Sequence, residues 1–229
     1  MKINFDKSFL EDASLKALIL SLEAGGGKVY YVGGCVRNAI LGKSVGEIDI
    51  ATDLLPKQVM KIAEKQGYSI IRTGISYGTV IIFVGKSEFQ VTTFRSDIKT
   101  FGRKAIVKFT SKMKLDAKRR DFTMNSIYMT TSGEIIDPLG SLNDLLSIRI
   151  KFIGNAAERI KEDKLRILRF FRFLTEFDKD FSDIDEDTLK ALNKYKGEVK
   201  SLSKERIWRE FKRILSFPNP QKIFNIMNE

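Results

Sequence analysis

Hydrophobic and polar positions follow two different spacings along the chain, and the spacing changes near residue 140. Residues 8–24 carry apolar side chains at helical spacing before a run of three glycines, which predicts an amphipathic helix. Runs rich in β-branched and aromatic residues are typical of strands, and they occur at 29–32, 48–50, 69–72, 79–84, 89–94 and 127–130. Helical segments are predicted at 36–41 and 56–66, and residues 121–126 are expected to begin or flank a helix.

After residue 140 the strand pattern stops and helical periodicity replaces it. It recurs over residues 156–177, 186–195 and 203–216, with few β-branched runs. We therefore predict two domains, a part containing both strands and helices over residues 1–140 and an all-α part over residues 141–229.

The composition excludes several chemistries. The 229 residues include no His and one Cys, so the chain has no catalytic His, no His-ligated metal site, no internal disulfide and no Cys-rich zinc site. Acid–base work and metal binding then fall to carboxylates, Lys, Tyr or bound water. We expect Cys35 to be a small buried residue and Trp208, the only Trp, to lie in the core, with base stacking as the alternative.

The charge balance favours nucleic acid or a phosphorylated ligand as partner. The formal net charge is +11, and the segment from Arg95 to Arg120 holds ten basic side chains against two acidic ones. We expect this segment to be a mobile basic arm that leads into a strand or extended stretch. It is either a solvated loop or a surface for RNA or triphosphate.

Membrane insertion and export are not expected. No apolar run approaches ~18 residues, the length that a membrane span needs, and the N-terminal segment lacks the apolar core of a signal peptide. A cytoplasmic protein without a membrane partner is the expectation.

The first candidate site combines a glycine pair with two acidic residues. Gly33 and Gly34 follow a predicted strand and precede a predicted helix, which lets backbone N–H groups approach a phosphate, and Arg37 lies one turn further on. Glu47 and Asp49 are two apart on the next strand and therefore point to the same face. Two carboxylates in a basic protein repel each other unless a cation lies between them, and Mg²⁺ would serve phosphoryl chemistry there.

Three further constellations carry charge at helical spacing. Residues 118–125 place basic residues beside an acid and an amide, which fits either a nucleotide contact or a capped helix start. Within the predicted helix 156–177, Glu162, Asp163 and Arg166 share one face, either as a surface salt bridge or as hydrogen-bonding groups for base edges. Residues 203–210 indicate a capped helix with ion pairs along it.

Taken in order, these segments resemble the class II tRNA nucleotidyltransferases, a family of CCA-adding enzymes and bacterial poly(A) polymerases within the DNA polymerase beta-like superfamily. The matching runs are VGGCVRNAILGKSVGEIDIATD (32–53), TGISYGTV (73–80), FQVTTFRSDIKTFGR (89–103), DAKRRDFTMNSIY (116–128), GEIIDPLGSLNDL (133–145), RIKEDKLRILRFFRF (159–173) and LSKERIWREFKRIL (202–215).

The resemblance implies an α+β fold, with a mixed-sheet catalytic head followed by an all-α neck. It also implies Mg²⁺-dependent addition of C, C and A from CTP and ATP to tRNA 3′ ends, without a nucleic-acid template. Two Mg²⁺ ions would be held by Glu47 and Asp49, with Gln90 at the third catalytic position. The nucleotide would be bound by Gly33, Gly34, Arg37, Arg120, Asp121, Asn125, Glu162, Asp163, Arg166 and Arg169, and the RNA by Arg95, Arg103, Lys104, Lys108, Lys204 and Arg206.

Several positions depart from the family pattern. Members usually have Asp at the positions of Asn38 and Glu47, Glu at the position of Gln90, and His where this chain has Tyr77 and Lys104. The longer side chain of Glu47 moves its oxygens by about a bond length, and misplacement of ~1 Å is costly in catalysis. Members also usually continue into body and tail regions that hold tRNA, so we expect a short form. A-only addition, poly(A) tailing and a catalytically impaired RNA-binding homologue are the alternatives.

Overall fold

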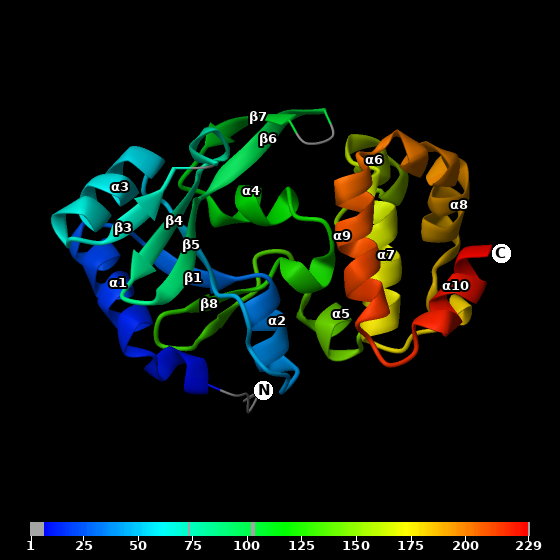
Figure 1. The fold of residues 1–229 in the computed structure, drawn as a ribbon, viewed down its shortest axis with the longest axis horizontal. Coiled ribbons are helices and arrows are strands. Elements are labelled where there is room, and N and C mark those ends of the chain that lie inside the picture. The colour runs from blue at the N-terminus through cyan, green and yellow to red at the C-terminus, as the bar shows by residue number, and fades with distance from the viewer. Residues whose placement is uncertain (1–6, 73, 102–103, 229) are drawn as a thin grey trace.

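The computed structural model describes residues 7–72, 74–101 and 104–228. A head built around a β-sheet occupies the left of Figure 1, and a group of helices, the neck, occupies the right. The predicted order of a sheet-containing part before an all-α part is confirmed, and the position of the boundary at residues 140/141 stays a prediction. No helix among the described residues is long and apolar enough to cross a membrane.

The head contains one seven-stranded mixed sheet with the strand order β3-β4-β5-β2-β1-β8-β9. Strands β2 and β5 are parallel and the other neighbours are antiparallel, which confirms the expected α+β class. The strands are β1 (Val29–Val32), β2 (Asp49–Thr52), β3 (Ser69–Ile71), β4 (Thr79–Val84), β5 (Ser87–Thr93), β8 (Tyr128–Thr130) and β9 (Ile135–Ile136).

Helices α1 (Ala13–Ala24) and α3 (Pro56–Lys65) pack on one face of the sheet. The predicted helix 8–24 is divided at Asp12, whose side chain accepts a hydrogen bond from the Leu15 backbone N–H (2.7 Å) and caps α1. Residues 8–11 form a separate 3₁₀ turn before it. The apolar stripe of α1 is fully buried and holds this layer on the sheet.

The opposite face of the sheet supports the site. Successive strand residues alternate between faces, so Val32 and Ala51 join Phe94 and Tyr128 in a second, smaller apolar cluster. Helix α2 (Gly34–Ile40) follows β1, and α4 (Met113–Lys118) packs beside this cluster. Because Asp49 lies two residues before Ala51, it belongs to this face.

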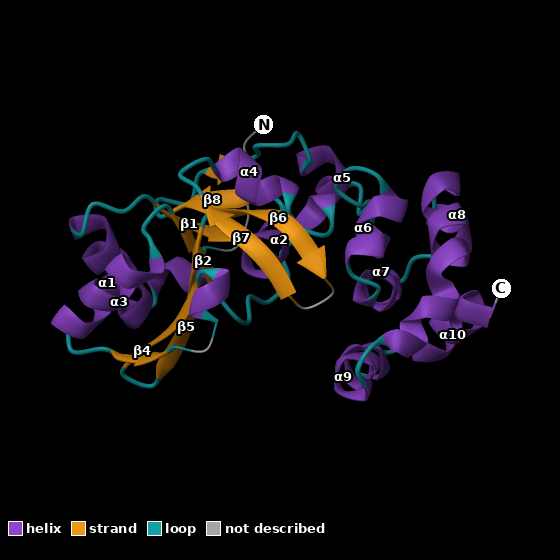
Figure 2. Ribbon diagram, turned by 90° about the horizontal axis from the view of Figure 1, so that it is seen from above, coloured by secondary structure: helices purple, strands orange, loops and turns teal. Residues whose placement is uncertain are grey.

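The predicted basic arm is a regular hairpin in the part that the structure describes. Strands β6 (Arg95–Phe101) and β7 (Lys104–Phe109) pair antiparallel, with a register shift between Asp97 and Lys99. The expected strand or extended stretch is confirmed, and an irregular loop is not found in the described residues, because cross-strand hydrogen bonds pair the backbone despite the crowded positive charge. The hairpin reaches from the head toward the side of the neck (Figures 1 and 2).

The neck contains helices throughout. Its helices are α5 (Leu142–Leu146), α6 (Ala156–Glu162), α7 (Leu165–Glu176), α8 (Glu186–Tyr195), α9 (Lys204–Leu215) and α10 (Pro220–Asn228). Helix α7 packs against α9 and α10, and α6 packs against α8. The single predicted helix 156–177 is interrupted, because Asp163 has extended backbone angles (φ −150°, ψ 110°) and ends α6. Residues 121–126, expected to begin or flank a helix, follow α4 and hold a 3₁₀ turn (Thr123–Asn125).

Candidate functional site

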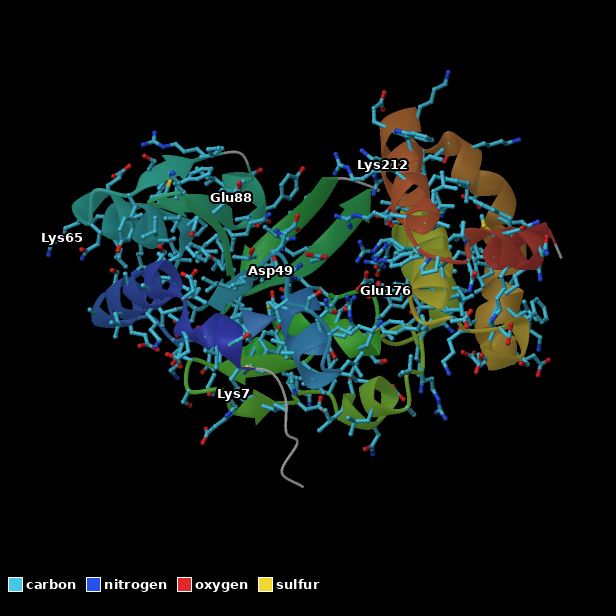
Figure 3. All side chains as sticks on the ribbon, turned by 60° about the horizontal axis from the view of Figure 1, so that its bottom comes forward. Lys7, Asp49, Lys65, Glu88, Glu176 and Lys212 are labelled. Atoms are coloured by element: carbon cyan, nitrogen blue, oxygen red, sulfur yellow. The ribbon has the colours of Figure 1, made fainter. Side chains whose placement is uncertain are left out.

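A polar cleft of about 340 Å³ lies where the second face of the sheet meets the neck. Figure 3 labels Asp49 on the head and Glu176 on the neck, on the two sides of this region. Both domains supply its walls, and most of the charged side chains are basic. The lining residues are Gly33, Gly34, Arg37, Asn38, Gly46, Glu47, Asp49, Arg120, Asp121, Asn125, Arg169, Arg172, Phe173 and Arg213.

Glycine is required at position 33 by its backbone conformation, and the turn lies next to two charged groups. Gly33 has φ 80° and ψ −131°, a backbone conformation that side chains disfavour. A Cβ atom at this position would lie 3.5 Å from Nη1 of Arg120 and 3.6 Å from Oδ2 of Asp49. The turn therefore leaves open the space directly beside the carboxylate.

The two predicted metal ligands both line the cleft. Asp49 is the first residue of β2, Glu47 precedes the strand, and the parallel register pairs Asp49 with Gln90 on β5. Paired residues on neighbouring strands point to the same face, so Gln90 lies beside Asp49. Burial raises the pKa of Asp49 and the charge of Glu47 adds to this, while Arg120 opposes it. A cation beside the two carboxylates would remove that repulsion.

Glu47 and Asp49 together suit a Mg²⁺ ion whose remaining ligands come from water and from the substrate. Among residues 7–72, 74–101 and 104–228, no group of three or more His, Cys, Asp or Glu side chains gathers to form a metal cage. Mg²⁺ typically takes one or two protein carboxylates and fills its remaining positions with water and substrate phosphates. Glu47 and Asp49 offer such a partial set.

Arg37 is held deep in the wall of the cleft. It is 7% exposed, and its guanidinium donates to Oδ1 of Asn125 (2.9 Å), to Oδ1 of Asn38 (2.9 and 3.1 Å) and to Glu176 (3.2 Å). It also lies 5.0 Å from the ring centre of Phe173. Burial lowers the pKa of Arg37, and Glu176 opposes this shift. Asn38 thus orients Arg37 through a neutral amide.

Asp121 and Asn125 form one hydrogen-bonded unit with the neck. Asp121 accepts from Nε of Arg169 (2.7 Å) and from the Asn125 side chain (3.1 Å). Burial alone would raise the pKa of Asp121, but Arg169 and Asn125 together lower it below its usual range. The contact joins a head residue to α7 across the cleft.

A second buried unit holds Arg120. Asp116, 1% exposed, accepts from Tyr128 (2.6 Å), Arg119 (2.8 Å) and Arg120 (3.1 Å). Burial opposes ionisation of Asp116, yet the two arginines outweigh it and lower the pKa to about 2. Arg120 is therefore oriented from behind by Asp116, while it stays close enough to Asp49 to act on its charge.

A set of buried ion pairs within α7 and between α7 and α9 was not predicted from the sequence. Arg172 on α7 donates to Glu210 on α9 (2.8 Å) and to Glu176 (3.4 Å), and Glu210 also lies 3.8 Å from Arg169. The sequence does contain one indication of these pairs, because Arg169, Arg172 and Glu176 are spaced three and four residues apart, as neighbours on a helix are. It places these three side chains on one face of α7, toward the cleft.

The residues expected to hydrogen-bond the base, Glu162, Asp163 and Arg166, are not among those that line the cleft. Glu162 pairs with Arg166 (2.6 Å) as expected, and also with Arg159. The expected Asp163–Arg166 pairing was wrong, because the helix ends at Asp163 and its carboxylate instead accepts from Arg206 (2.7 Å). Glu162, Asp163 and Arg206 line a separate pocket of about 380 Å³.

The predicted RNA-binding residues divide into three groups. Lys108 and Lys204 are exposed, as a phosphate contact requires. Arg206 is half-buried against Asp163, and the Arg95 side chain is 17% exposed, 4.0 Å from Asp97, with burial as the main cause of a pKa lowered to about 10. Arg103 and the side chain of Lys104 lie outside the described residues.

The fold is that of a polymerase head domain. Residues 29–151 match the poly(A) polymerase head domain, and residues 180–229 match the probable RNA- and SrmB-binding site of polymerase A. The chain belongs to this poly(A) polymerase family, and the resemblance noted from the sequence motifs is confirmed.

The relatives are CCA-adding enzymes. The chain is 41% identical over 204 residues to the CCA-adding enzyme of Bacillus cytotoxicus (88% of this chain, 50% of the relative). It is 36% identical to that of Enterococcus faecalis (89% and 49%). The chain therefore spans about half the length of the curated relatives that it matches.

Two solved structures share the fold. The Bacillus stearothermophilus CCA-adding enzyme in complex with CTP gives a TM-score of 0.77 at 33% identity, covering 90% of this chain and 50% of that one. A tRNA nucleotidyltransferase complexed with a primer tRNA and an incoming ATP analog gives 0.73 at 25% identity, covering 92% and 59%.

Proposed function

We propose that this chain transfers nucleotides from CTP and ATP to the 3′ end of tRNA, adding C, C and A. The observation that carries the proposal is the pair Glu47 and Asp49, beside the Gly33 turn, in a cleft whose other charged walls are mainly arginine. Relatives named CCA-adding enzymes, and solved structures with CTP and with primer tRNA, support the choice of substrates.

In the proposed reaction the 3′-hydroxyl oxygen of the RNA attacks the α-phosphorus, and the bond to the leaving pyrophosphate breaks. Arg37 and Arg120 would bind the triphosphate, since both guanidiniums line the cleft and are already oriented by neighbours. Asp121 and Asn125 would contact the ribose, with Arg169 holding Asp121 in place. Two Mg²⁺ ions at Glu47 and Asp49 would supply Lewis-acid stabilisation of the developing charge.

Selection of the base is assigned to Glu162, Asp163 and Arg166. In the present arrangement their polar groups are paired with Arg159, Arg206 and one another, so a base would have to replace some of these bonds. Arg95, Arg103, Lys104, Lys108, Lys204 and Arg206 are proposed to bind RNA.

One experiment distinguishes CCA addition from two alternative functions. A-only addition or poly(A) tailing is supported by the poly(A) polymerase head match, and impaired catalysis is supported by Gln90 at the third position. Incubation of single NTPs with tRNA transcripts that end before the first C, after CC and after CCA separates these activities. We expect CMP incorporation on the first transcript and AMP incorporation on the second.

The decisive variant is Asp49→Ala, which is expected to abolish incorporation of both nucleotides. Glu64→Ala is the matched control, because Glu64 is an exposed carboxylate on α3, the helix that packs on the opposite face of the sheet from Asp49. Normal incorporation by Asp49→Ala would show that the assigned metal ligand is wrong. Absence of pyrophosphate release with every NTP and transcript, at full tRNA binding, would support the impaired homologue.

A further inference from the structure

The only Trp of the chain lies on the surface, which corrects the expectation that it belongs to the core. Trp208 is 62% exposed on α9, although it is the largest apolar side chain type. The buried face of α9 is formed by Glu210 and Ile214, which pack toward α7 and its arginines. Trp208 lies on the outward side because it is two residues before Glu210 on the helix.

Most of the charged side chains near Trp208 on α9 are basic, although Glu205 lies one turn before it. Lys204 and Lys212 lie one turn before and after it, and Arg209 is its neighbour. All three are exposed, and no ion pair involves them within the described ranges. Figure 3 labels Lys212 on this helix. An exposed indole among unpaired cations is a poor surface for an apolar protein groove, but suits a polyanion that carries aromatic bases.

The basic surface continues from Trp208 to the cleft. Arg213, one turn beyond Arg209 on α9, is one of the residues that line the cleft with Asp49. Arg209 and Lys212 therefore occupy the part of the helix surface between the indole and the cleft wall. An RNA strand whose 3′ end lies in the cleft could therefore place its next phosphates against Arg209 and Lys212. A base further from the 3′ end would then lie against Trp208.

We propose that Trp208 is a stacking platform for a base in the single-stranded 3′ region of the RNA, with Arg209 and Lys212 binding the adjacent phosphates. The proposal rests on the proposed function for the position of the RNA 3′ end. Aromatic stacking is tolerant of sequence, because every base presents a π-face. The platform would therefore hold the primer while different nucleotides are added.

The single Trp provides the probe. Intrinsic fluorescence of the full chain is measured without NTP and without Mg²⁺, during titration with a tRNA transcript that ends after CC. A second transcript lacks the single-stranded 3′ nucleotides and ends at the acceptor stem. We expect quenching with the first transcript and little change with the second. No quenching at saturating amounts of the first transcript, with binding verified by filter retention, would overturn the proposal.

Variants separate stacking from folding. Trp208→Ala is expected to weaken retention of the CC-ended transcript roughly 5- to 150-fold, and Trp208→Phe to restore most of it. Leu20→Ala is the control, because Leu20 is equally exposed (65%) but lies on α1 of the head. Wild-type affinity in Trp208→Ala would refute the platform and leave a protein partner as the reason for the exposed indole.

The two proposals can fail separately. Trp208 lies outside the cleft, so Trp208→Ala should keep its rate of CMP incorporation at saturating RNA and show only a raised KM for RNA. Quenching in a wild-type chain that incorporates no nucleotide would support the platform and refute the proposed function. Incorporation by the wild-type chain, with no effect of Trp208→Ala on the KM for RNA, would support the proposed function and refute the platform.

Discussion

Substitution of Glu210 by Ala tests the buried ion pairs that orient the arginines of the cleft. The Glu210 side chain is 4% exposed, accepts from Nε of Arg172 at 2.8 Å and lies 3.8 Å from Arg169. Glu210→Ala removes the carboxylate and leaves two arginines, 9% and 29% exposed at their side chains, with one partner fewer.

The expected loss in the free energy of unfolding depends on the ion-pair partners that remain for each arginine. Removing one partner of a buried pair costs about 3–5 kcal/mol, because the remaining charge stays desolvated. Arg169 retains Asp121, and Arg172 retains a longer contact of 3.4 Å to Glu176. The cost should therefore lie near the lower end, at about 3 kcal/mol, which corresponds to roughly 6–12 °C in Tm for a chain of this size.

Urea denaturation gives the free energy of unfolding directly. The matched control is Glu64→Ala, which breaks a pair of similar length (3.0 Å, Arg72) whose side chains are 52% and 67% exposed. Exposed pairs contribute less than about 1 kcal/mol, so the control should be nearly neutral. Equal losses in the two variants would refute the claim that burial, rather than distance, determines the contribution of Glu210.

Three further outcomes follow from the site. The pKa of Asp116 is lowered to about 2, below its ordinary value of 3.8, so the ionised carboxylate contributes about 2 kcal/mol to the free energy of unfolding above pH 4, and this contribution is lost as the pH falls toward 2. Urea titration across that pH range should show that Asp116→Asn lacks this pH-dependent part of the free energy of unfolding. Gly33→Ala should lower the unfolding free energy by about 1–3 kcal/mol and reduce incorporation, because φ is 80° and the new methyl group would lie beside Asp49; unchanged urea titrations would contradict the assigned strain. Gln90→Glu should lower the Mg²⁺ concentration needed for half-maximal CMP incorporation, since it adds a carboxylate beside Asp49, whereas an unchanged or higher requirement would mean that Gln90 takes no part in metal binding.

Local patterns predicted most of the secondary structure correctly. The strands at residues 29–32, 79–84 and 89–94 and the helices at 56–66, 186–195 and 203–216 were all found within a few residues of their predicted bounds. These segments have one clear periodicity and recognisable start or stop residues. The predictions failed where two local signals competed.

Asp163 illustrates such a competition. The apolar periodicity continues through residues 156–177, but the Asp163 carboxylate caps the Leu165 backbone N–H (3.1 Å) and pairs with Arg206, which is 43 residues away. Similarly, the charge of residues 95–109 left a solvated loop open as one alternative, whereas the described residues pair with each other as β6 and β7. Both outcomes depend on partners that the local pattern does not contain.

The sequence by itself determined the glycine turn, the acidic pair two residues apart and the basic character of the chain, because these depend on residue type and short spacing. Only the tertiary structure decided which charges pair across the cleft. Arg37 meets Glu176 over 139 positions, and Arg172 meets Glu210 over 38. It also decided that Trp208 faces solvent, since the side of α9 that is buried depends on the arginines of α7 as much as on hydrophobicity. Buried ion pairs must be satisfied in three dimensions, and that requirement is not readable from spacing along one chain.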